Sequence, residues 1–420
     1  MAAALQALVD RRLTSVRRAL SAAALVAATA VVAAVAGCGT STASPTAAPV
    51  LGLDWGRVTS VERPQVYEET VAPSYVGAHP ILRIAGQAMM TDLVARVGGG
   101  FAAIGYVPPD WHPTAWTSDD GAAWTLRPME DAAFTFPVAI ARGQDGTLVA
   151  VGRSGSKPVA WTSPDGAAWT RHDVPVLSTD GIAERMTSVV ATSSGFVAGG
   201  SAGPELLDRH ARFWTSPDGV TWTPAPDRAE TFDDAEVRSI TTRADRSIIA
   251  VGVVGSVQQP TGSEAWWSID GRLWKRLQDP DFEGGLAVSV VSGPSGSLVA
   301  VGSDLDRRNA VSWTSADGVD WMRSPAEPSR QHSGGYAWMT DVTVVGDQLI
   351  AVGTLQGLQR GTAIAWTSID GITWTQARSA PVQEGAEFYA IVPGGPGALV
   401  VGAFGAPDSY VPEVWQSPAH

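Results

Sequence analysis

Residues 160–170 read "AWTSPDGAAWT", and residues 365–375 repeat this stretch almost letter for letter as "AWTSIDGITWT". When the chain is aligned with itself, the pattern W-x-S-x-D-G-x-x-W occurs six times, and the first tryptophans of neighbouring copies lie 45 to 53 residues apart. The copies begin at Trp116, Trp161, Trp214, Trp266, Trp313 and Trp366, and a shortened seventh copy begins at Trp415. Repeats of this length are typical of folds assembled from one supersecondary unit.

A short apolar segment that ends in glycine precedes each copy, for example "FVAGG" at residues 196–200 and "LVAVG" at residues 298–302. No helical period is visible, and turn residues separate the apolar segments, so each unit is expected to hold four β-strands. Repeated four-stranded units that cannot cover their own apolar faces are typical of β-propellers. The sequence therefore predicts an all-β fold, a propeller of seven four-stranded antiparallel blades.

The "SPDG" segment predicts a tight hairpin between the third and fourth strands of a blade, with its glycine in the left-handed conformation. If Pro164, Asp165 and Gly166 form the loop, Trp161 lies directly opposite Trp169 on the neighbouring strand. Such a cross-strand pair contributes roughly 0.2–1 kcal/mol beyond its burial. We therefore expect one tryptophan pair in every blade.

The seventh unit lacks a fourth strand, whereas the segment "VLGLDWGRV" at residues 50–58 precedes the first unit and contains Trp55. We expect this N-terminal strand to complete the C-terminal blade and to close the ring. Three of the 17 tryptophans then remain outside the pattern: Trp111, Trp267 and Trp338. The alternative is an open or eight-bladed arrangement in which residues 58–85 form an extra partial blade.

The repeated blocks resemble the Asp-box, or BNR, repeats of propellers such as sialidases, sortilin-type receptors and photosystem assembly factors. Those repeats usually run S-x-D-x-G-x-x-W, whereas the glycine here directly follows the aspartate, as in Ser163, Asp165, Gly166 and Trp169. The resemblance covers nearly all of residues 86–420. It implies a propeller with the box at the turn between the third and fourth strands, and it implies a structural role for the box.

The N-terminus has the pattern of an export signal, because four arginines precede an Ala/Val/Leu run that ends near residue 36. The stretch "VAGC" at residues 35–38 resembles the lipobox of bacterial lipoprotein precursors, which implies cleavage before Cys38 and lipidation of its sulfur. We therefore predict a signal peptide at 1–37, a Ser/Thr/Pro-rich flexible tether at 38–49 and the propeller at 50–420. The body would be lipid-anchored on the outer face of a bacterial cell membrane, and an uncleaved transmembrane anchor is the alternative.

Composition excludes several classes of function. The formal net charge is −13 and the sequence contains no Lys/Arg cluster, which argues against nucleic-acid binding and favours a neutral or basic partner. Cys38 is the only cysteine, so no intramolecular disulfide can form. The six histidines have no metal-ligand spacing, and no phosphate-binding or nucleophile motif is present. We therefore expect neither a metal nor a cofactor.

Functional residues are expected on one face of the propeller. The loops at residues 106–114, 202–211, 227–237 and 329–338 are long and dissimilar, and binding residues concentrate in such loops on a rigid frame. The candidate ligand-binding residues are Trp111, Tyr336 and Trp338 as an aromatic platform, and Glu184, Arg185, Glu236, Arg238 and Tyr389 at the mouth of a central channel. Each also has a structural interpretation, in which the tryptophans cover the core and the charged groups pair with one another.

The resemblance to sialidases implies a catalytic alternative, with a tyrosine nucleophile, a glutamate and three arginines that hold a substrate carboxylate. The segment "ILRIAG" at residues 81–86 is similar to their Arg-Ile-Pro motif and implies Arg83 as the first arginine, although Ala85 replaces the proline. Sialidases have six blades. The sequence therefore favours a monomeric, non-catalytic binding or scaffold module for an envelope protein or a cell-wall glycan. A sialidase-like exo-glycosidase and an assembly factor for a membrane complex remain as alternatives.

Overall fold

The computed structural model describes residues 55–63, 87–108, 110–129, 131–177, 182–203, 209–256, 259–325, 335–356, 361–377, 385–395, 397–405 and 410–417. All of them belong to one compact unit, Leu51–His420. The predicted signal peptide and tether, with Cys38, lie outside the described residues, as does Arg83. Among the helices of the described part, none has the length and apolar character needed to cross a membrane.

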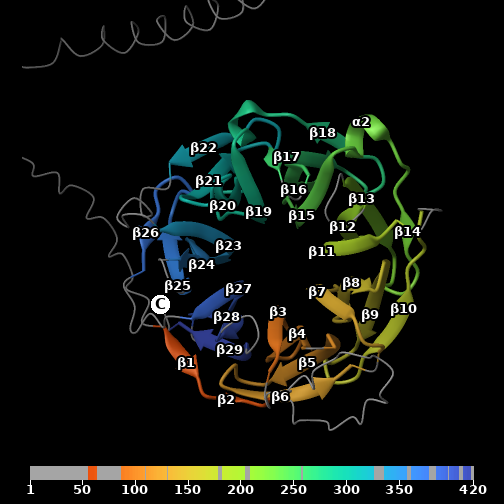
Figure 1. Cartoon of the computed structure of the whole chain (residues 1–420), viewed down its shortest axis with the longest axis vertical. Coiled ribbons are helices and arrows are strands. Elements are labelled where there is room, and N and C mark those ends of the chain that lie inside the picture. Colours follow the sequence, from red (N-terminus) through yellow and green to blue (C-terminus); the bar gives the residue numbers. More distant parts are fainter. Residues whose placement is uncertain are drawn as a thin grey trace, which may run out of the picture. The chain divides into compact units, whose positions relative to one another are not determined.

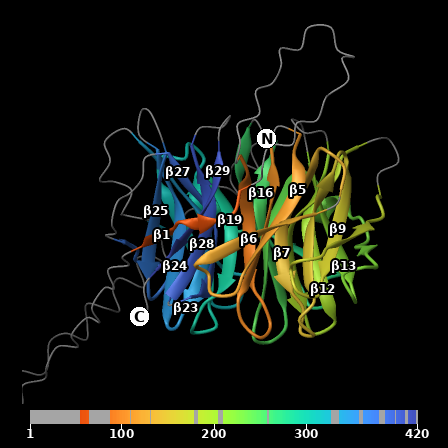
Figure 2. The same ribbon diagram turned by 90° about the horizontal axis from the view of Figure 1, so that it is seen from below.

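Seven antiparallel sheets surround a common axis and form a β-propeller, as the repeats predict (Figure 1). Each blade uses four consecutive strands in simple up-and-down order, except where the ring closes. Seen from the side in Figure 2, the strands run between two faces of the ring. Blades 1 to 7 are numbered in chain order, and each has an inner strand next to the axis, then a second, a third and an outer strand.

The inner strands are β3 (Met89–Ala95), β7 (Thr135–Arg142), β11 (Glu184–Thr192), β15 (Ala235–Thr242), β19 (Gly285–Ser292), β23 (Tyr336–Val345) and β27 (Ala386–Gly394). The second strands are β4 (Phe101–Val107), β8 (Leu148–Ser154), β12 (Gly195–Ala202), β16 (Ile248–Gly255), β20 (Leu298–Asp304), β24 (Gln348–Gln356) and β28 (Gly397–Phe404). The third strands are β5 (His112–Ser118), β9 (Lys157–Ser163), β13 (His210–Ser216), β17 (Pro260–Ser268), β21 (Ala310–Ser315), β25 (Gly361–Ser368) and β29 (Val411–Gln416). The outer strands are β6 (Ala123–Pro128), β10 (Thr170–Asp173), β14 (Thr223–Pro224), β18 (Lys275–Leu277), β22 (Met322–Pro325), β26 (Thr375–Gln376) and β1 (Gly56–Val58).

The N-terminal strand closes the ring as predicted. β1 pairs with β29 so that Arg57 lies opposite Trp415, and it supplies the outer strand of blade 7. The rings of Trp55 and Trp415 both pack against Phe388, with centroid distances of 6.4 and 5.8 Å. Blade 7 is therefore assembled from both ends of the described chain.

The alternative prediction, in which residues 58–85 form an extra partial blade, is wrong for residues 58–63, the part of this segment that the structure describes. β2 (Ser60–Val61) lies parallel to β6 and adds a fifth strand to blade 1. Glu62 then accepts a hydrogen bond from Trp116 Nε1 through its carbonyl oxygen (3.0 Å) and one from Leu126 N through its carboxylate (2.9 Å). The segment from β1 to β2 thus ties the last blade to the first.

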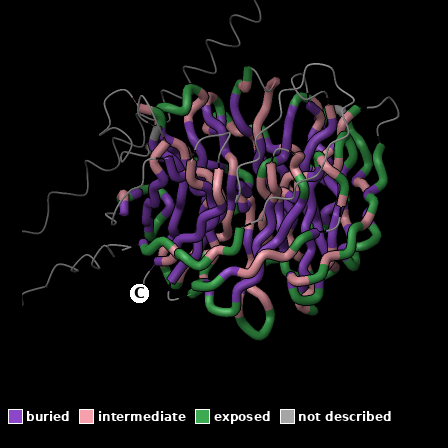
Figure 3. Tube along the Cα trace, turned by 60° about the horizontal axis from the view of Figure 1, so that its bottom comes forward, coloured by how far each residue is buried: buried purple, intermediate pink, exposed green. Residues whose placement is uncertain are grey.

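The hydrophobic core lies between neighbouring blades. Each cluster joins side chains of two adjacent sheets; one cluster, for example, contains Ala102 and Ile104 of blade 1 together with Leu148 and Trp161 of blade 2. Figure 3 shows that the buried residues follow the strands, whereas exposed residues gather at the turns. Each blade therefore buries its apolar faces only when its neighbours are present.

The box turns differ from the predicted hairpin. Trp161 lies opposite Arg171, and the loop between β9 and β10 covers residues 164–169, so Trp169 falls within the loop. The prediction that Trp161 and Trp169 are directly opposed was wrong. Both indoles nevertheless belong to the same interface between blades, where Trp161 is buried and Trp169 packs beside it.

Side chain to backbone hydrogen bonds explain the wider loop. Ser163 Oγ accepts a hydrogen bond from Gly166 N, and Asp165 Oδ1 accepts one from Ala167 N, both at 2.8 Å. Trp169 Nε1 donates to the carbonyl oxygen of Gly166 at 2.9 Å. Because these side chains bind the backbone N–H groups, those groups cannot continue the strand ladder.

The glycine of the box has the predicted left-handed conformation. Gly166 has φ 81°, and a Cβ atom at this position would lie 2.8 Å from the Cβ of Ala102 in the preceding blade. The turn therefore requires glycine for its backbone angle and for close packing against the neighbouring sheet.

A β-bulge interrupts every inner strand at the same place. The bulged residues are Thr91, Val138, Thr187, Arg238, Val288, Thr340 and Tyr389. The threonines donate to a carbonyl oxygen of the next blade, as Thr187 Oγ1 does to Val237 at 2.6 Å and Thr340 Oγ1 to Phe388 at 2.8 Å. The other four bulged residues are not threonines. Two of them, Val138 and Val288, are apolar, whereas Arg238 and Tyr389 are large and polar.

Candidate functional site at the loop face

The two faces of the ring carry different connections. The loop face is defined here as the end where the inner strands begin and where the second strand connects to the third. The hairpin face is the opposite end, which carries the box turns. Because side chains alternate along a strand, successive residues of an inner strand face the two neighbouring blades in turn. Arg238, Tyr389, Tyr336 and Trp338 lie on inner strands, in the part nearest the loop face.

Two of the predicted long loops contain regular secondary structure. Strand pairing continues to Val107 opposite His112, so only four residues connect β4 to β5. The segment at 227–237 contains a short helix, α2 (Ala229–Phe232), before β15 begins. A 3-10 turn, η1 (Pro280–Phe282), occupies the corresponding place in the next blade.

Three arginines surround the carboxylate of Glu236. Arg185 approaches it to 3.2 Å and Arg238 to 3.3 Å, and Arg209 forms a third ion pair with it. The Glu236 side chain is only 6% exposed, and that of Arg209 is 9% exposed. Three guanidinium groups around one carboxylate leave a positive charge, which is opposite in sign to the −13 of the whole chain.

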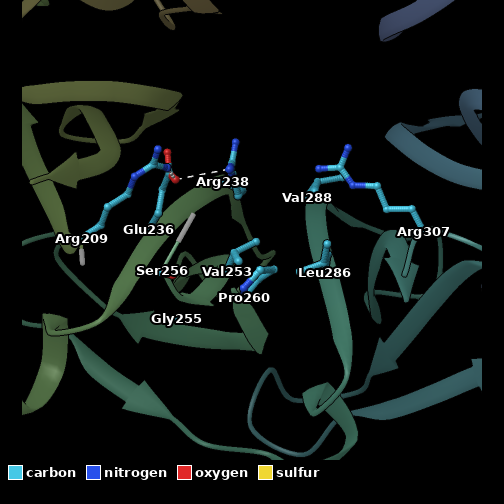
Figure 4. A pocket seen from close by; sticks show the side chains of 10 residues that line it. All are labelled: Arg209, Glu236, Arg238, Val253, Gly255, Ser256, Pro260, Leu286, Val288 and Arg307. Atoms are coloured by element: carbon cyan, nitrogen blue, oxygen red, sulfur yellow. Dashed lines mark ion pairs between the residues drawn. The ribbon is translucent and has the colours of Figure 1, made fainter. Parts of the chain in front are cut away.

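A pocket of about 170 Å³ opens beside this cluster, between β15 and β19. Figure 4 shows Glu236 between Arg209 and Arg238, with Arg307 approaching from the other side of the pocket. The remaining lining residues are mostly apolar: Val253, Gly255, Ser256, Pro260, Leu286 and Val288. The pocket therefore combines cationic groups with an apolar wall.

Arg307 is presented by a tight loop that joins β20 to β21. Asp304 accepts hydrogen bonds from Arg308 N (2.7 Å) and from Asn309 Nδ2 (2.6 Å), which fold the loop around its carboxylate. The carbonyl oxygen of Arg307 accepts from Ala337 N of the next blade at 2.7 Å, and Arg307 itself has φ 55°. Arg307 is exposed, and the described part of the chain offers its guanidinium no hydrogen bond or ion pair.

Glu184 and Arg185 begin β11 but have different surroundings. Glu184 is fully buried, and its Oε1 accepts a hydrogen bond from Leu177 N at 3.0 Å. It therefore holds the segment that leads into the blade. Arg185 donates to Ser201 Oγ (3.2 Å) and pairs with Glu236, so it supports the arginine cluster.

Tyr389 belongs to a second cluster, on blade 7. Its hydroxyl donates to one carboxylate oxygen of Glu387 at 2.8 Å, and the Tyr410 hydroxyl donates to the other at 3.0 Å. Burial and the charge of Glu387 raise the pKa of Tyr389 well above its ordinary value, and they raise the pKa of Tyr410 to about 12. Both phenols are therefore protonated at neutral pH.

Trp111 lies in an aromatic group on blades 1 and 2. Its ring centroid is 5.3 Å from that of Tyr106 and 5.7 Å from that of Phe136, and the Arg153 guanidinium lies 4.4 Å from the Phe136 centroid. Trp111 is half-buried with φ 57°, a conformation that is rare for a bulky side chain. The rings fix its orientation at the loop face.

The structure separates the predicted aromatic platform. Tyr336, which is 47% exposed, and the half-buried Trp338 lie on β23 of blade 6, whereas Trp111 lies on blade 1. In Figure 1, β15 and β19 lie across the axis from β27 and β3. The loop face thus has an arginine-rich sector on blades 3 to 5 and a tyrosine-rich sector on blades 7 and 1.

Sequence reasoning missed two members of the arginine cluster. Arg209 and Arg307 each precede a third strand, in segments whose length and sequence vary between the repeats. A usable signal was present, because the corresponding segments "DRHAR" and "DRRNA" are locally rich in arginine although the chain is acidic. Among the described residues there is no group of three or more His, Cys, Asp or Glu side chains that could hold a metal ion.

Comparison with known proteins supports the propeller fold and does not show a family for this chain. No family model matches the chain, and no curated protein sequence matches it. The solved structure of YCF48 bound to D1 peptide is 14% identical with a TM-score of 0.52, covering 81% of this chain and 94% of that chain. A protein of unknown function from Dyadobacter fermentans is 15% identical with a TM-score of 0.49, covering 79% and 95%. Trypanosoma rangeli sialidase is 10% identical with a TM-score of 0.46, covering 71% and 56%.

Proposed function

We propose that this chain is a non-catalytic binding module that holds a segment of another envelope protein at the loop face of its propeller. The observation that carries the proposal is the pocket between β15 and β19, in which Arg238 and Arg307 flank an apolar wall. The propeller of YCF48, which shares the fold, was solved with a peptide bound, and this supports a peptide as the kind of partner. An assembly factor for a membrane complex would use the same site and differ only in its partner.

The catalytic alternative finds less support at the loop face. A sialidase-like site needs arginines beside its tyrosine and glutamate, yet Arg185 and Arg238 contact Glu236 on the far side of the axis from Tyr389. The raised pKa of Tyr389 also opposes formation of a nucleophilic phenolate. A glycan-binding site would favour an exposed aromatic shelf, whereas Trp111 packs against Tyr106 and Phe136.

The membrane anchor is part of the proposal and rests on the lipobox that ends at Cys38. Expression of the full chain in a bacterium fed with an alkyne-labelled fatty acid tests it. The wild-type protein should carry the label and fractionate with membranes, and Cys38→Ser should lose the label. Labelling that persists in the variant would contradict lipidation at this residue.

Selection from a phage-displayed library of random dodecapeptides tests the binding function. Peptides selected on the purified full chain should bind the wild-type protein, and the variant Arg238→Glu should bind them much more weakly. Arg272→Glu is the matched control, because Arg272 is exposed on the hairpin face of the same blade. Failure to select any peptide, or hydrolysis of a fluorogenic sialoside that is lost in Tyr389→Phe, would contradict the proposal.

A further inference from the structure

The geometry points to a specific ligand group for this pocket. We propose that it binds a carboxylate of the partner segment between Arg238 and Arg307, and that the apolar side chain next to this carboxylate packs against Val253, Leu286 and Val288. This inference rests on the proposed function and names the chemistry that the site selects. The partner is therefore an acidic and apolar peptide, although the chain itself is acidic.

The ion pairs of the cluster leave Arg238 available to a ligand. Glu236 is held from the inside by Arg185 and Arg209, whose side chains are 22% and 9% exposed. Arg238 contacts Glu236 through one terminal nitrogen and remains 41% exposed. A guanidinium has several N–H donors in a planar fork, so Arg238 can bind a second carboxylate without releasing the first.

Arg307 provides the opposite half of the site. Its guanidinium is exposed and has no acceptor among the described residues, while its loop is fixed by Asp304 and by Ala337 N. A bound carboxylate would give this side chain its ion pair. Because the backbone is already held in place, only the side chain has to be ordered on binding, which limits the entropic cost.

The bulge of β15 holds Arg238 at a position that packing does not require to be cationic. At the same place in other inner strands, Thr187 and Thr340 form hydrogen bonds between blades. The neighbouring strand β19 has Val288 there and β7 has Val138, so an apolar side chain also fits. An exposed cation at this position is therefore better explained by binding than by packing.

The size of the pocket limits what accompanies the carboxylate. Its volume of about 170 Å³ is close to that of an apolar cavity of about 150 Å³ that holds one benzene molecule. This admits one apolar side chain and excludes a folded element of the partner. The carboxylate can come from an internal Glu or Asp side chain or from the C-terminus of a chain, and the experiment separates the two.

The test uses the peptides selected on the wild-type protein. Their sequences should be enriched in Asp or Glu next to Leu, Ile, Val or Phe, and the enrichment should disappear when selection is repeated on Arg307→Ala. A synthetic end-blocked copy of a selected peptide should lose roughly ten- to a hundredfold in affinity when its acidic residue is replaced by the corresponding amide. The affinity should fall with added salt.

Further measurements separate the outcomes. Arg272→Ala should bind with unchanged affinity, and Arg307→Ala should retain the wild-type circular dichroism because its side chain is exposed. A peptide truncated after the apolar residue, with a free carboxylate in place of the internal acid, should bind if a chain terminus is the natural source. This inference would be overturned if a selected peptide bound the loop face equally well with its acidic residue and with the corresponding amide. The proposed function would then still stand. Absence of any loop-face peptide would overturn both.

Discussion

The hairpin face and the loop face of this propeller are built by opposite rules. At the hairpin face one solution recurs in every complete repeat: a serine Oγ accepts from the glycine N, at 2.8 Å in the blade of Ser163 and at 2.9 Å in the blade of Ser268. At the loop face equivalent positions diverge, and the bulge that holds Thr187 in one blade holds Arg238 in the next. The box residues recur because every blade needs the same packing. A residue such as Arg238, which differs from its counterparts in other blades, is a candidate for a role other than packing.

The largest expected effect comes from removing the negative charge at the centre of the arginine cluster. Glu236→Gln leaves Arg185 and Arg209 largely buried around a neutral amide, which should lower the free energy of unfolding by roughly 3–5 kcal/mol. Urea denaturation measures the change. Glu387→Gln is the matched control at the same register of blade 7, because its partners are neutral tyrosine hydroxyls. Equal losses in the two variants would show that the cluster is not held by charge.

A substitution at the hairpin face should affect stability alone. Gly166→Ala combines a left-handed backbone with a Cβ contact of 2.8 Å to Ala102, and it should destabilise the fold by roughly 2–4 kcal/mol. Gly346→Ala has a similar φ of 60° and open space around the added atom, so it should cost only about 1 kcal/mol. Affinity for the selected peptides should remain unchanged in both variants, and a loss of affinity would weaken the division between the faces.

The hydrogen bonds between blades at the inner strands should contribute less. Thr187→Val removes the donor to the carbonyl oxygen of Val237 (2.6 Å) and should cost about 1–1.5 kcal/mol in thermal or urea denaturation. Val138 occupies the same bulge in blade 2, so the apolar side chain fits this position. Val138→Thr serves as the reverse change and should be neutral or stabilising. Destabilisation by both changes would argue against a common role for the bulge.

The last expected effect is a pH dependence that differs between the inner strands and the box turns. Burial, with some repulsion from Asp341, raises the pKa of Asp92 to about 8, and burial raises the pKa of Asp341 to about 6. The folded state therefore keeps protons that the unfolded state loses above about pH 4, and this contribution to stability decreases as the pH rises from about 4 to about 8. The hydrogen bond from the backbone N–H of Ala167 lowers the pKa of Asp165. The stability that this ionised carboxylate contributes to the box turn is therefore lost only when the pH falls into the acid range.

Asp92→Ser isolates the pH dependence of the inner strands. Asp92 accepts a hydrogen bond from Ile140 N at 2.9 Å, and Ser188 accepts the equivalent bond from Ile240 N at 3.1 Å in another blade. Serine should therefore keep the bond between blades and remove the titrating group. Melting temperatures measured between about pH 5 and about pH 8 should vary less in the variant than in the wild type. An unchanged slope would assign the pH dependence to other groups.

Much of the fold follows from local patterns in the sequence. The spacing of the box motif predicts the blade number, the glycine predicts a positive φ at Gly166, and the unpaired segment with Trp55 predicts closure against Trp415. These predictions succeeded because each depends on a short stretch or on a count. The position of Trp169 was predicted wrongly, because serine and aspartate side chains compete with the strand ladder for the backbone N–H groups of the loop.

The candidate site was only partly predictable. Arg185, Glu236 and Arg238 were found because they begin inner strands, but nothing local indicates that they meet, or that Arg209 and Arg307 join them. Net charge does not locate the cluster, because it averages over the whole chain.

The sequence by itself determined a ring of seven blades and the turn residues that each blade needs, since one packing arrangement is repeated within short, contiguous segments. Only the tertiary structure decided which charged side chains meet. The approach of Arg185 and Arg238 to one carboxylate, and the position of Arg307 across the same pocket, depend on how blades 3 to 5 pack side by side, which no single segment encodes.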